Sequence, residues 1–191
     1  NRRDAVARVG LLFGGTLIGA EAFLAGCAKR PEETVSWMNF SAETISLLDE
    51  VGETILPATA SSPGAKEAMI GEFMKAIVRD CYEEKDQHIF MEGIPKLNEA
   101  SRNAYQKNFV KLSPADKHDL IVNIDREAKE FNDSKKPEEP AHYFTMIKQL
   151  TLWGYFTSEV GSTKALRYLP VPGRYEGCIP YTKGDKAWAA T

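Results

Sequence analysis

The sequence lacks the short motifs that usually build metal, haem and nucleotide sites. Its three cysteines form no C-x-x-C pair and no C-x-x-C-H haem attachment, and its three histidines form no H-x-x-x-H pair. Neither a G-x-G-x-x-G loop nor a Walker loop occurs. We therefore expect no cofactor or metal in this chain, and no enzymatic activity of its own.

Runs of basic residues are also missing. The 191 residues include 24 Lys and Arg against 27 Asp and Glu, which gives a net charge of −3. Proteins that bind nucleic acid need concentrated positive charge to neutralise phosphates. The sequence therefore predicts no nucleic-acid partner.

The first 27 residues contain the parts of an export signal. Arg2 and Arg3 precede an almost uncharged stretch, residues 9–26, which ends in the sequence LAGC at Cys27. A charged start, an apolar middle and small residues before a cleavage point are typical of a secretory signal peptide. Paired arginines resemble a twin-arginine signal, which exports folded proteins, and LAGC resembles a lipobox. We expect residues 1–26 to be a signal peptide and Cys27 to be lipidated on the periplasmic side of the envelope.

Two other interpretations of this leader stay open. It could be an ordinary Sec-exported lipoprotein signal, or it could be retained as a single membrane helix. A helix needs roughly 20 apolar residues to span a bilayer, and residues 9–28 just reach that length with Glu21 inside. A charge at mid-membrane costs about 2.5–3.5 kcal/mol on insertion scales, so the cleaved lipoprotein is favoured.

The body of the chain has the periodicity of an all-α protein, because alternating strand patterns are nearly absent. Residues 27–40 read as a tether, and residues 41–160 as a small bundle of about five helices. Ser41 is a good N-cap, and Ser113-Pro114 is a strong helix start. Met69 and Ala104 are expected on buried helix faces. The expected helices lie near residues 41–56, 69–84, 87–110, 114–131 and 141–158.

Residues 161–191 have a different character. Prolines and glycines rule out regular structure across most of this segment, yet it is rich in tyrosine and other large apolar residues. Disordered tails are usually polar and poor in aromatics. We therefore predict an extended tail that packs along a surface, either that of its own chain or that of a partner.

Two cysteines remain if Cys27 carries lipid. In an oxidising compartment Cys81 and Cys178 could form a disulfide between the second helix and the tail. They could equally be separate thiols, or one of them could be bridged to a partner.

Three stretches of the body carry a resemblance to a known family. They are LLDEVGETILPA at residues 47–58 with the following Pro63-Gly64-Ala65, FVKLSPAD at residues 109–116, and FTMIKQLTLWGYFTSEVG at residues 144–161. Their order and spacing resemble the gluconate 2-dehydrogenase subunit 3 family over about residues 41–181. The third stretch follows the family signature almost throughout.

The resemblance implies an accessory role. Members of this family are non-catalytic small subunits of membrane-associated sugar or polyol dehydrogenases. Their partner is an FAD-dependent large subunit of the glucose-methanol-choline type, and a cytochrome c with haem, or another acceptor, takes the electrons. The small subunit commonly carries the twin-arginine signal for both. This fits a flavoprotein that must fold around FAD before export.

The residues expected to contact that partner are aromatic, because Tyr and Trp dominate interface energetics. Arg167 and Arg174 are candidate interface charges. For Trp153 and Phe156 the alternative is that they close the core of the bundle. The expected contact residues are Trp153, Tyr155, Phe156, Tyr168, Tyr175 and Tyr181.

Two other functions compete with that of an accessory subunit that escorts its partner through export. The chain could be a free-standing envelope lipoprotein that binds a ligand or a protein through its aromatic tail. It could also be an enzyme, but the missing motifs argue against this.

Overall fold

Five α-helices form the body of the protein in the computed structural model, which describes residues 37–171, 173–174 and 177–189. They are α2 (Ala42–Ile55), α3 (Ile70–Cys81), α4 (Glu84–Tyr105), α5 (Pro114–Ser134) and α6 (Tyr143–Thr157). No β-strand occurs among the described residues, which contain only two isolated β-bridges. The all-α prediction is confirmed. The signal peptide with Arg2 and Arg3, the lipidation site Cys27 and the interface candidate Tyr175 lie outside the described residues.

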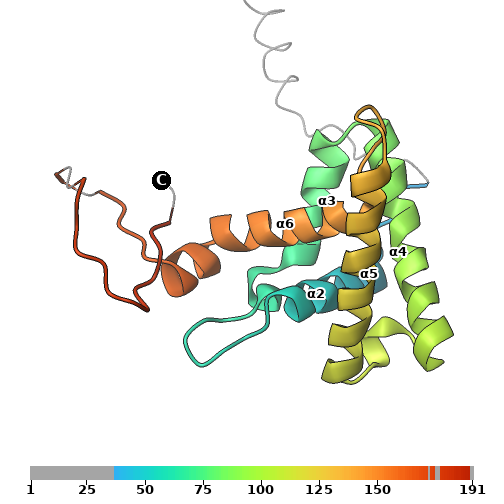
Figure 1. Ribbon diagram of the computed structural model, residues 1–191, viewed down its shortest axis with the longest axis horizontal. Helices are drawn as coiled ribbons and strands as arrows, with labels where there is room; N and C mark the ends of the chain where they lie inside the picture. Colours follow the sequence, from blue (N-terminus) through green and yellow to red (C-terminus); the bar gives the residue numbers. More distant parts are fainter. Residues whose placement is uncertain (1–36, 172, 175–176, 190–191) are drawn as a thin grey trace, which may run out of the picture. The chain divides into compact units, whose positions relative to one another are not determined.

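Helix α6 lies at the centre of the arrangement. It contacts each of the other four helices, and Figure 1 shows it running across α3, α4 and α5 rather than alongside them. A helix surrounded in this way has to be apolar on most of its faces. This explains why the sequence of α6 is the most continuously hydrophobic in the body.

The helix starts follow the capping residues of the sequence. The backbone N–H of Thr44 donates to Ser41 Oγ at 3.2 Å, and that of Asp116 donates to Ser113 Oγ at 3.2 Å, with Pro114 in the first turn. Each cap satisfies an N–H group that has no partner inside its helix. Both predicted starts are confirmed.

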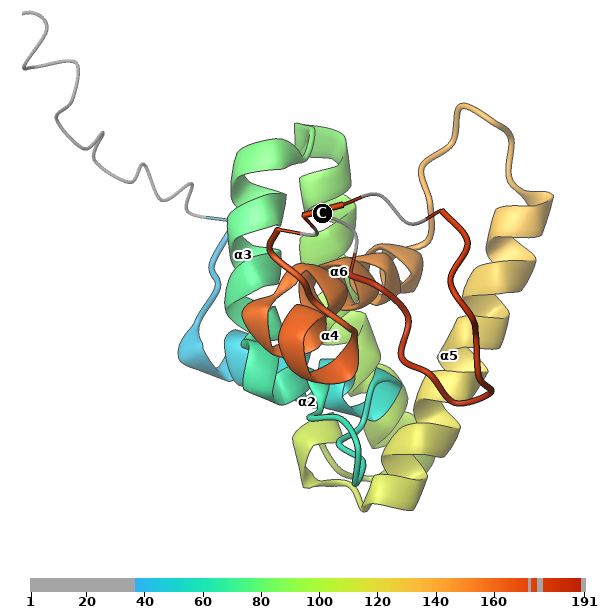
Figure 2. The same cartoon turned by 90° about the vertical axis from the view of Figure 1, so that its left-hand side faces the viewer.

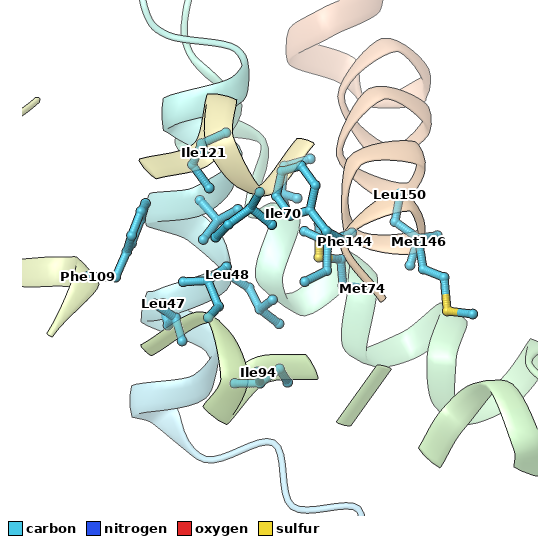
Figure 3. Close-up of a cluster of buried hydrophobic side chains, with 14 of the residues drawn as sticks. Leu47, Leu48, Ile70, Met74, Ile94, Phe109, Ile121, Phe144, Met146 and Leu150 are labelled. Carbon is cyan, nitrogen blue, oxygen red and sulfur yellow. The ribbon is translucent and has the colours of Figure 1, made fainter. Parts of the chain in front are cut away.

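The core collects side chains from all five helices (Figure 3). Phe90, Phe109 and Phe144 are fully buried. Among the described residues, every buried side-chain nitrogen or oxygen has a hydrogen-bond partner. Packing on this scale is what stabilises a bundle of helices too short to be stable alone. The labelled members in Figure 3 are Leu47, Leu48, Ile70, Met74, Ile94, Phe109, Ile121, Phe144, Met146 and Leu150.

Some details differ from the expectation. Met69 was expected inside the second helix, but it lies at the N-cap of α3 and has a left-handed backbone, with φ 51°. Its side chain is 68% exposed. Ala104 is exposed near the end of α4. Helix α4 begins at Glu84 and contains Pro95 in its interior, so the expected start at Gln87 was late.

Three acidic residues of α2 hold the neighbouring segments in place. Asp49 Oδ1 accepts from the backbone N–H of Gly71 at 2.8 Å, at the start of α3. Glu53 accepts from the N–H groups of Ala58 and Lys66, both at 2.9 Å, and so closes the loop after α2. A Cβ at Gly64 would lie 2.1 Å from Glu53 Oε1, which explains the glycine in this loop.

Between them, Glu50 contacts two lysines. Its carboxylate lies 2.8 Å from Lys117 Nζ on α5 and also pairs with Lys66. Burial raises the pKa of Glu50, but the hydrogen bonds from Lys117 and Lys66 outweigh this and lower it below the ordinary value of 4.5. The first family-like stretch therefore has a structural role.

None of the described helices combines the length and the apolarity needed to cross a bilayer.

Candidate partner interface

Three large apolar side chains at the C-terminal end of α6 remain exposed. Leu152 is 37% exposed, Trp153 52% and Phe156 39%, whereas Leu150, Thr151 and Gly154 on the same helix are buried. We call Leu152, Trp153 and Phe156 the α6 patch. Large apolar side chains gathered at one exposed place on a protein surface are typical of binding surfaces.

The α6 patch is braced by helix α3. The ring of Phe73 meets that of Trp153 edge-on, with centroids 5.4 Å apart and planes at 87°. A Cβ at Gly154 would lie 2.5 Å from Phe73 Cδ1, so the glycine lets the two helices approach. Trp153 is therefore held in place by its own chain while half of its surface stays free. The alternative, in which Trp153 closes the core of the bundle, applies only to the part of the ring that packs against Phe73.

Tyr155 does not belong to this surface. It is 3% exposed, its Oη donates to the carbonyl oxygen of Pro63, and Ser62 Oγ lies 2.8 Å from the same Oη. Its side chain is buried and hydrogen-bonded within the bundle, so in this structure the prediction of Tyr155 as a contact residue is wrong. The physical reason is helix geometry, since residues 153 and 155 point about 200° apart on an α-helix.

The chain leaves α6 through a tight junction. Ser158 Oγ donates to Tyr155 O at 2.7 Å and accepts from the N–H of Gly161 at 3.0 Å. A Cβ at Gly161 would lie 1.8 Å from Tyr155 O, so a glycine is required there. A π-helical turn, Gly161–Ala165, follows. This junction directs the C-terminal segment away from the bundle, as Figure 1 shows.

The C-terminal segment returns to its own beginning instead of trailing away. The N–H of Arg167 donates to Ala187 O at 2.8 Å, and the N–H of Ala189 donates to Arg167 O at 2.9 Å. The guanidinium carbon of Arg167 lies 4.7 Å from the ring centroid of Trp188, a cation–π contact, and Arg167 Nη2 lies 3.9 Å from Asp185 Oδ2. We call Arg167, Asp185 and Trp188 the latch, and residues 168–186 the arm.

The arm exposes most of its apolar side chains. Figure 2 shows it as a spread loop, and Val171 and Tyr181 are each 77% exposed. Tyr168, at 46%, and Ile179, at 43%, are also accessible. The predicted contact residues Tyr168 and Tyr181 therefore lie on an exposed surface.

A hollow of about 540 Å³ lies at the base of the arm. Arg167 and Lys186 supply positive charge to its lining, Asp185 supplies negative charge, and Thr163 and Tyr168 add hydroxyl groups. No group of three or more metal-ligating side chains occurs among the described residues. The chemistry of this hollow suits a charged or hydrogen-bonding side chain of another molecule.

The remaining candidates are placed as follows. Cys81 and Cys178 are both free and exposed, so the structure does not contain the disulfide between them. His142 caps α6, because its Nδ1 accepts from the backbone N–H of Phe144 at 3.3 Å. Sequence reasoning missed the latch role of Trp188 and the exposure of Leu152. The alternation of α6 between buried and exposed positions could have revealed Leu152.

A comparison with protein families matches residues 42–173 to the family described as gluconate 2-dehydrogenase subunit 3. The match covers the helical body, the α6 patch and the start of the arm. Comparison with curated proteins and with solved structures gives no match. The match spans well over half of the chain and confirms the resemblance of its three motifs. The protein belongs to the gluconate 2-dehydrogenase subunit 3 family, whose name denotes a subunit of a dehydrogenase complex.

Proposed function

We propose that this chain is the non-catalytic small subunit of a periplasmic sugar or polyol dehydrogenase, and that it escorts an FAD-dependent large subunit of the glucose-methanol-choline type through export. The observation that carries the proposal is the α6 patch. Trp153 and Phe156 are exposed beside a well-filled core, on a chain whose family is named for one part of a complex. A partner surface would bury these rings.

The hydrogen bonds and ion pairs made by four titratable side chains support a non-catalytic role. Asp49, Glu50 and Glu53 hold segments of the fold, and His142 caps a helix. General acid–base catalysis needs a carboxyl or imidazole group that is free to exchange protons with a substrate. These four side chains are committed to the structure instead.

In this proposal FAD belongs to the partner. The hollow beside Arg167 is formed by side chains of an extended arm and the π-helical turn before it. A dinucleotide site instead needs a glycine-rich turn that leads into a helix N-terminus, where the pyrophosphate binds. The hollow does not fit FAD. A haem-bearing cytochrome c or another acceptor would receive the electrons from the large subunit.

The leader supplies the export part of the proposal. A flavoprotein acquires FAD in the cytoplasm and must then cross the membrane folded, which a twin-arginine signal permits. Arg2 and Arg3 would serve both subunits, and lipid on Cys27 would hold the complex at the membrane.

Deletion of this gene tests the escort role. Dye-linked sugar oxidation is measured in the cytoplasmic and envelope fractions of deleted cells that are complemented with variants. We expect the activity to stay in the cytoplasm after deletion and with Arg2→Lys plus Arg3→Lys. With Cys27→Ala it should be exported but released from the membrane. Undiminished activity in the envelope of deleted cells would overturn the proposal.

The hollow favours one alternative, a free-standing lipoprotein that binds a small polar ligand there. Titration of the full chain with gluconate and glucose would detect this. This alternative would replace the escort function if two results were obtained together. The ligand would bind saturably to the wild type but not to an Asp185→Ala variant, and no flavoprotein would co-purify with the chain.

A further inference from the structure

We propose that Met69, at the start of α3, is a contact residue that extends the candidate interface from the α6 patch onto α3, and that the surface of the flavin-bearing subunit covering it is apolar and near neutral. The inference rests on the proposed function, because it takes that subunit as the occupant. It adds a contact residue from a second helix and the chemistry of the partner surface at that place.

The first support is that neither burial nor backbone preference explains a methionine at this position. Its backbone is left-handed, with φ 51°, a conformation that is unfavourable for a residue with a Cβ and that glycine adopts readily. Its side chain is 68% exposed, and no other large apolar side chain is as exposed among the described residues of the bundle. Strained positions of this kind cluster at binding sites, where the side chain has a use outside its own fold.

The second support is the position of Met69 beside the α6 patch. The N–H of Phe73 donates to Met69 O at 3.2 Å, so Met69 lies one helical turn before Phe73. The ring of Phe73 in turn meets that of Trp153 edge-on, with centroids 5.4 Å apart. Residues one turn apart on a helix are neighbours on its surface. A partner that covers Trp153 can therefore cover Met69 as well.

The third support is the balanced charge around Met69. Three ion pairs involve charged residues within six positions of it in the sequence, and both members of each pair belong to this chain. They are Lys66 with Glu50, Glu67 with Lys164 at 2.7 Å, and Glu72 with Lys75 at 3.4 Å. Protein interfaces commonly combine an apolar centre, depleted of charge, with a polar rim. The surface that fits over Met69 is therefore apolar and carries little net charge.

These charges favour a protein over a lipid surface. Anionic leaflets attract clusters of Lys and Arg, whereas Glu67 and Glu72 would face the same headgroups here. Methionine is flexible and polarizable, which suits an irregular protein surface. The family match includes residue 69 and names one subunit of a dehydrogenase, so the occupant we take is the flavin-bearing subunit. A lipid surface and a second copy of this chain are outcomes of the test.

The test measures affinity between full-length variants and the flavin-bearing subunit purified from native membranes. Met69→Gln keeps the unbranched shape of the side chain but gives it a polar end, so it should weaken binding by about fivefold. Its Tm should stay within about 1 °C of that of the wild type, because the side chain is exposed in the fold. Met69→Leu, which keeps an apolar side chain of similar volume, should bind within about twofold of the wild type.

Met69→Gly separates a contact role from a structural one by the direction of its effects. Glycine relieves the left-handed backbone, so the Tm should rise by about 2–4 °C while the affinity falls at least as far as in Met69→Gln. The matched control is Gln106→Gly at the C-cap of α4, where the backbone is also left-handed, with φ 59°. This control should gain Tm in the same way without any change in affinity.

Two charged variants test the chemistry of the partner surface. Met69→Lys and Met69→Glu should weaken binding by similar factors, because a near-neutral apolar surface favours neither sign of charge. Tighter binding by one of them than by the wild type would contradict a near-neutral partner surface.

The outcomes separate the two proposals. If the wild type binds no flavoprotein, the proposed function fails. If the wild type binds and Met69→Gln and Met69→Gly bind equally well, this inference fails while the proposed function stands. Two further measurements are binding to vesicles of equal parts phosphatidylglycerol and phosphatidylethanolamine, and self-association by sedimentation equilibrium. Loss of either in Met69→Gln, with unchanged affinity for the flavoprotein, would assign Met69 to lipid or to a second copy and overturn the inference.

Discussion

Tyr155 Oη donates a hydrogen bond to the carbonyl oxygen of Pro63, across 92 positions of sequence. The bond joins two stretches by which the family can be recognised, the Pro63-Gly64-Ala65 turn and the signature of α6. Both stretches therefore have a structural reason to occur together. The aromatic residues of α6 divide accordingly, with Tyr155 directed into the fold and Trp153 directed to the surface.

This division predicts opposite results for two variants. Tyr155→Phe keeps the ring but leaves the Pro63 carbonyl without this donor, so the free energy of unfolding should fall by about 1 kcal/mol. Its affinity for the flavin-bearing subunit should not change. Trp153→Ala should lower that affinity by about tenfold or more. Urea unfolding and a binding titration on both variants check this, and equal loss of affinity in the two would refute the division.

Two glycines should respond differently to alanine. A Cβ at Gly161 would meet Tyr155 O at 1.8 Å, and backbone cannot move aside as a flexible side chain can. Gly161→Ala should therefore destabilise the fold by about 1–3 kcal/mol. At Gly52, inside α2, the nearest atoms to a new Cβ lie at 3.5 Å, an ordinary contact.

Gly52→Ala serves as the matched control for this substitution. It should be neutral or stabilise by up to about 1 kcal/mol, because alanine loses less backbone entropy than glycine in a helix. Thermal unfolding of the two variants measures the contrast. A Gly161→Ala variant as stable as the wild type would show that the junction after α6 is not as tight as described.

Glu50 should contribute stability that depends on pH. Its pKa is lowered in the fold, although burial alone would raise it, because Lys117 and Lys66 bond to the carboxylate. A carboxyl group with a lowered pKa stabilises the protein above its ordinary value of 4.5, and this contribution is lost as the pH falls through the lower folded value.

Glu50→Gln should therefore cost about 1–2 kcal/mol at neutral pH and progressively less in acid. The control is Glu72→Gln, which removes an exposed pair with Lys75 at 3.4 Å and should cost less than about 0.5 kcal/mol. Urea unfolding at several pH values gives both numbers. A Glu50→Gln penalty that stayed constant down to pH about 3 would contradict the assigned role of the charge.

His142 predicts a second pH effect. Burial lowers its pKa below the ordinary 6.5, Lys96 lowers it further, and Glu127 opposes them. The neutral ring caps α6, so its stabilisation is present above pH 6.5 and is lost as the pH falls through the folded pKa.

His142→Asn retains a capping oxygen but cannot titrate. The fall in Tm between pH about 7.5 and about 5 should be smaller in this variant than in the wild type. His118→Asn, on an exposed position of α5, should leave that fall unchanged. Equal slopes in the wild type and His142→Asn would remove the histidine from the pH response.

Much of the bundle follows from local sequence signals. The caps at Ser41 and Ser113 and the apolar faces around Met74 and Leu150 act over one or two helical turns, so they are visible in the sequence. The start of α4 was misplaced because Glu83 caps it without a side-chain hydrogen bond, and Pro95 lies inside the helix.

The candidate interface was less predictable. Tyr155 and Trp153 are both aromatic, and their different fates depend on Pro63 and Phe73, which lie on other elements. The latch joins Arg167 to Trp188 across the whole arm, and no local pattern marks such a closure. Long-range contacts of this kind have to be seen in three dimensions.

Purification of the chain from native membranes, with its own leader and without crosslinking, tests the central claim most directly. The absorbance spectrum of the purified material should show flavin, and a second, larger polypeptide should be present in equal amount. Trp153→Ala should reduce both. Material that contains this chain alone, with no flavin absorbance in the wild type, would contradict the account.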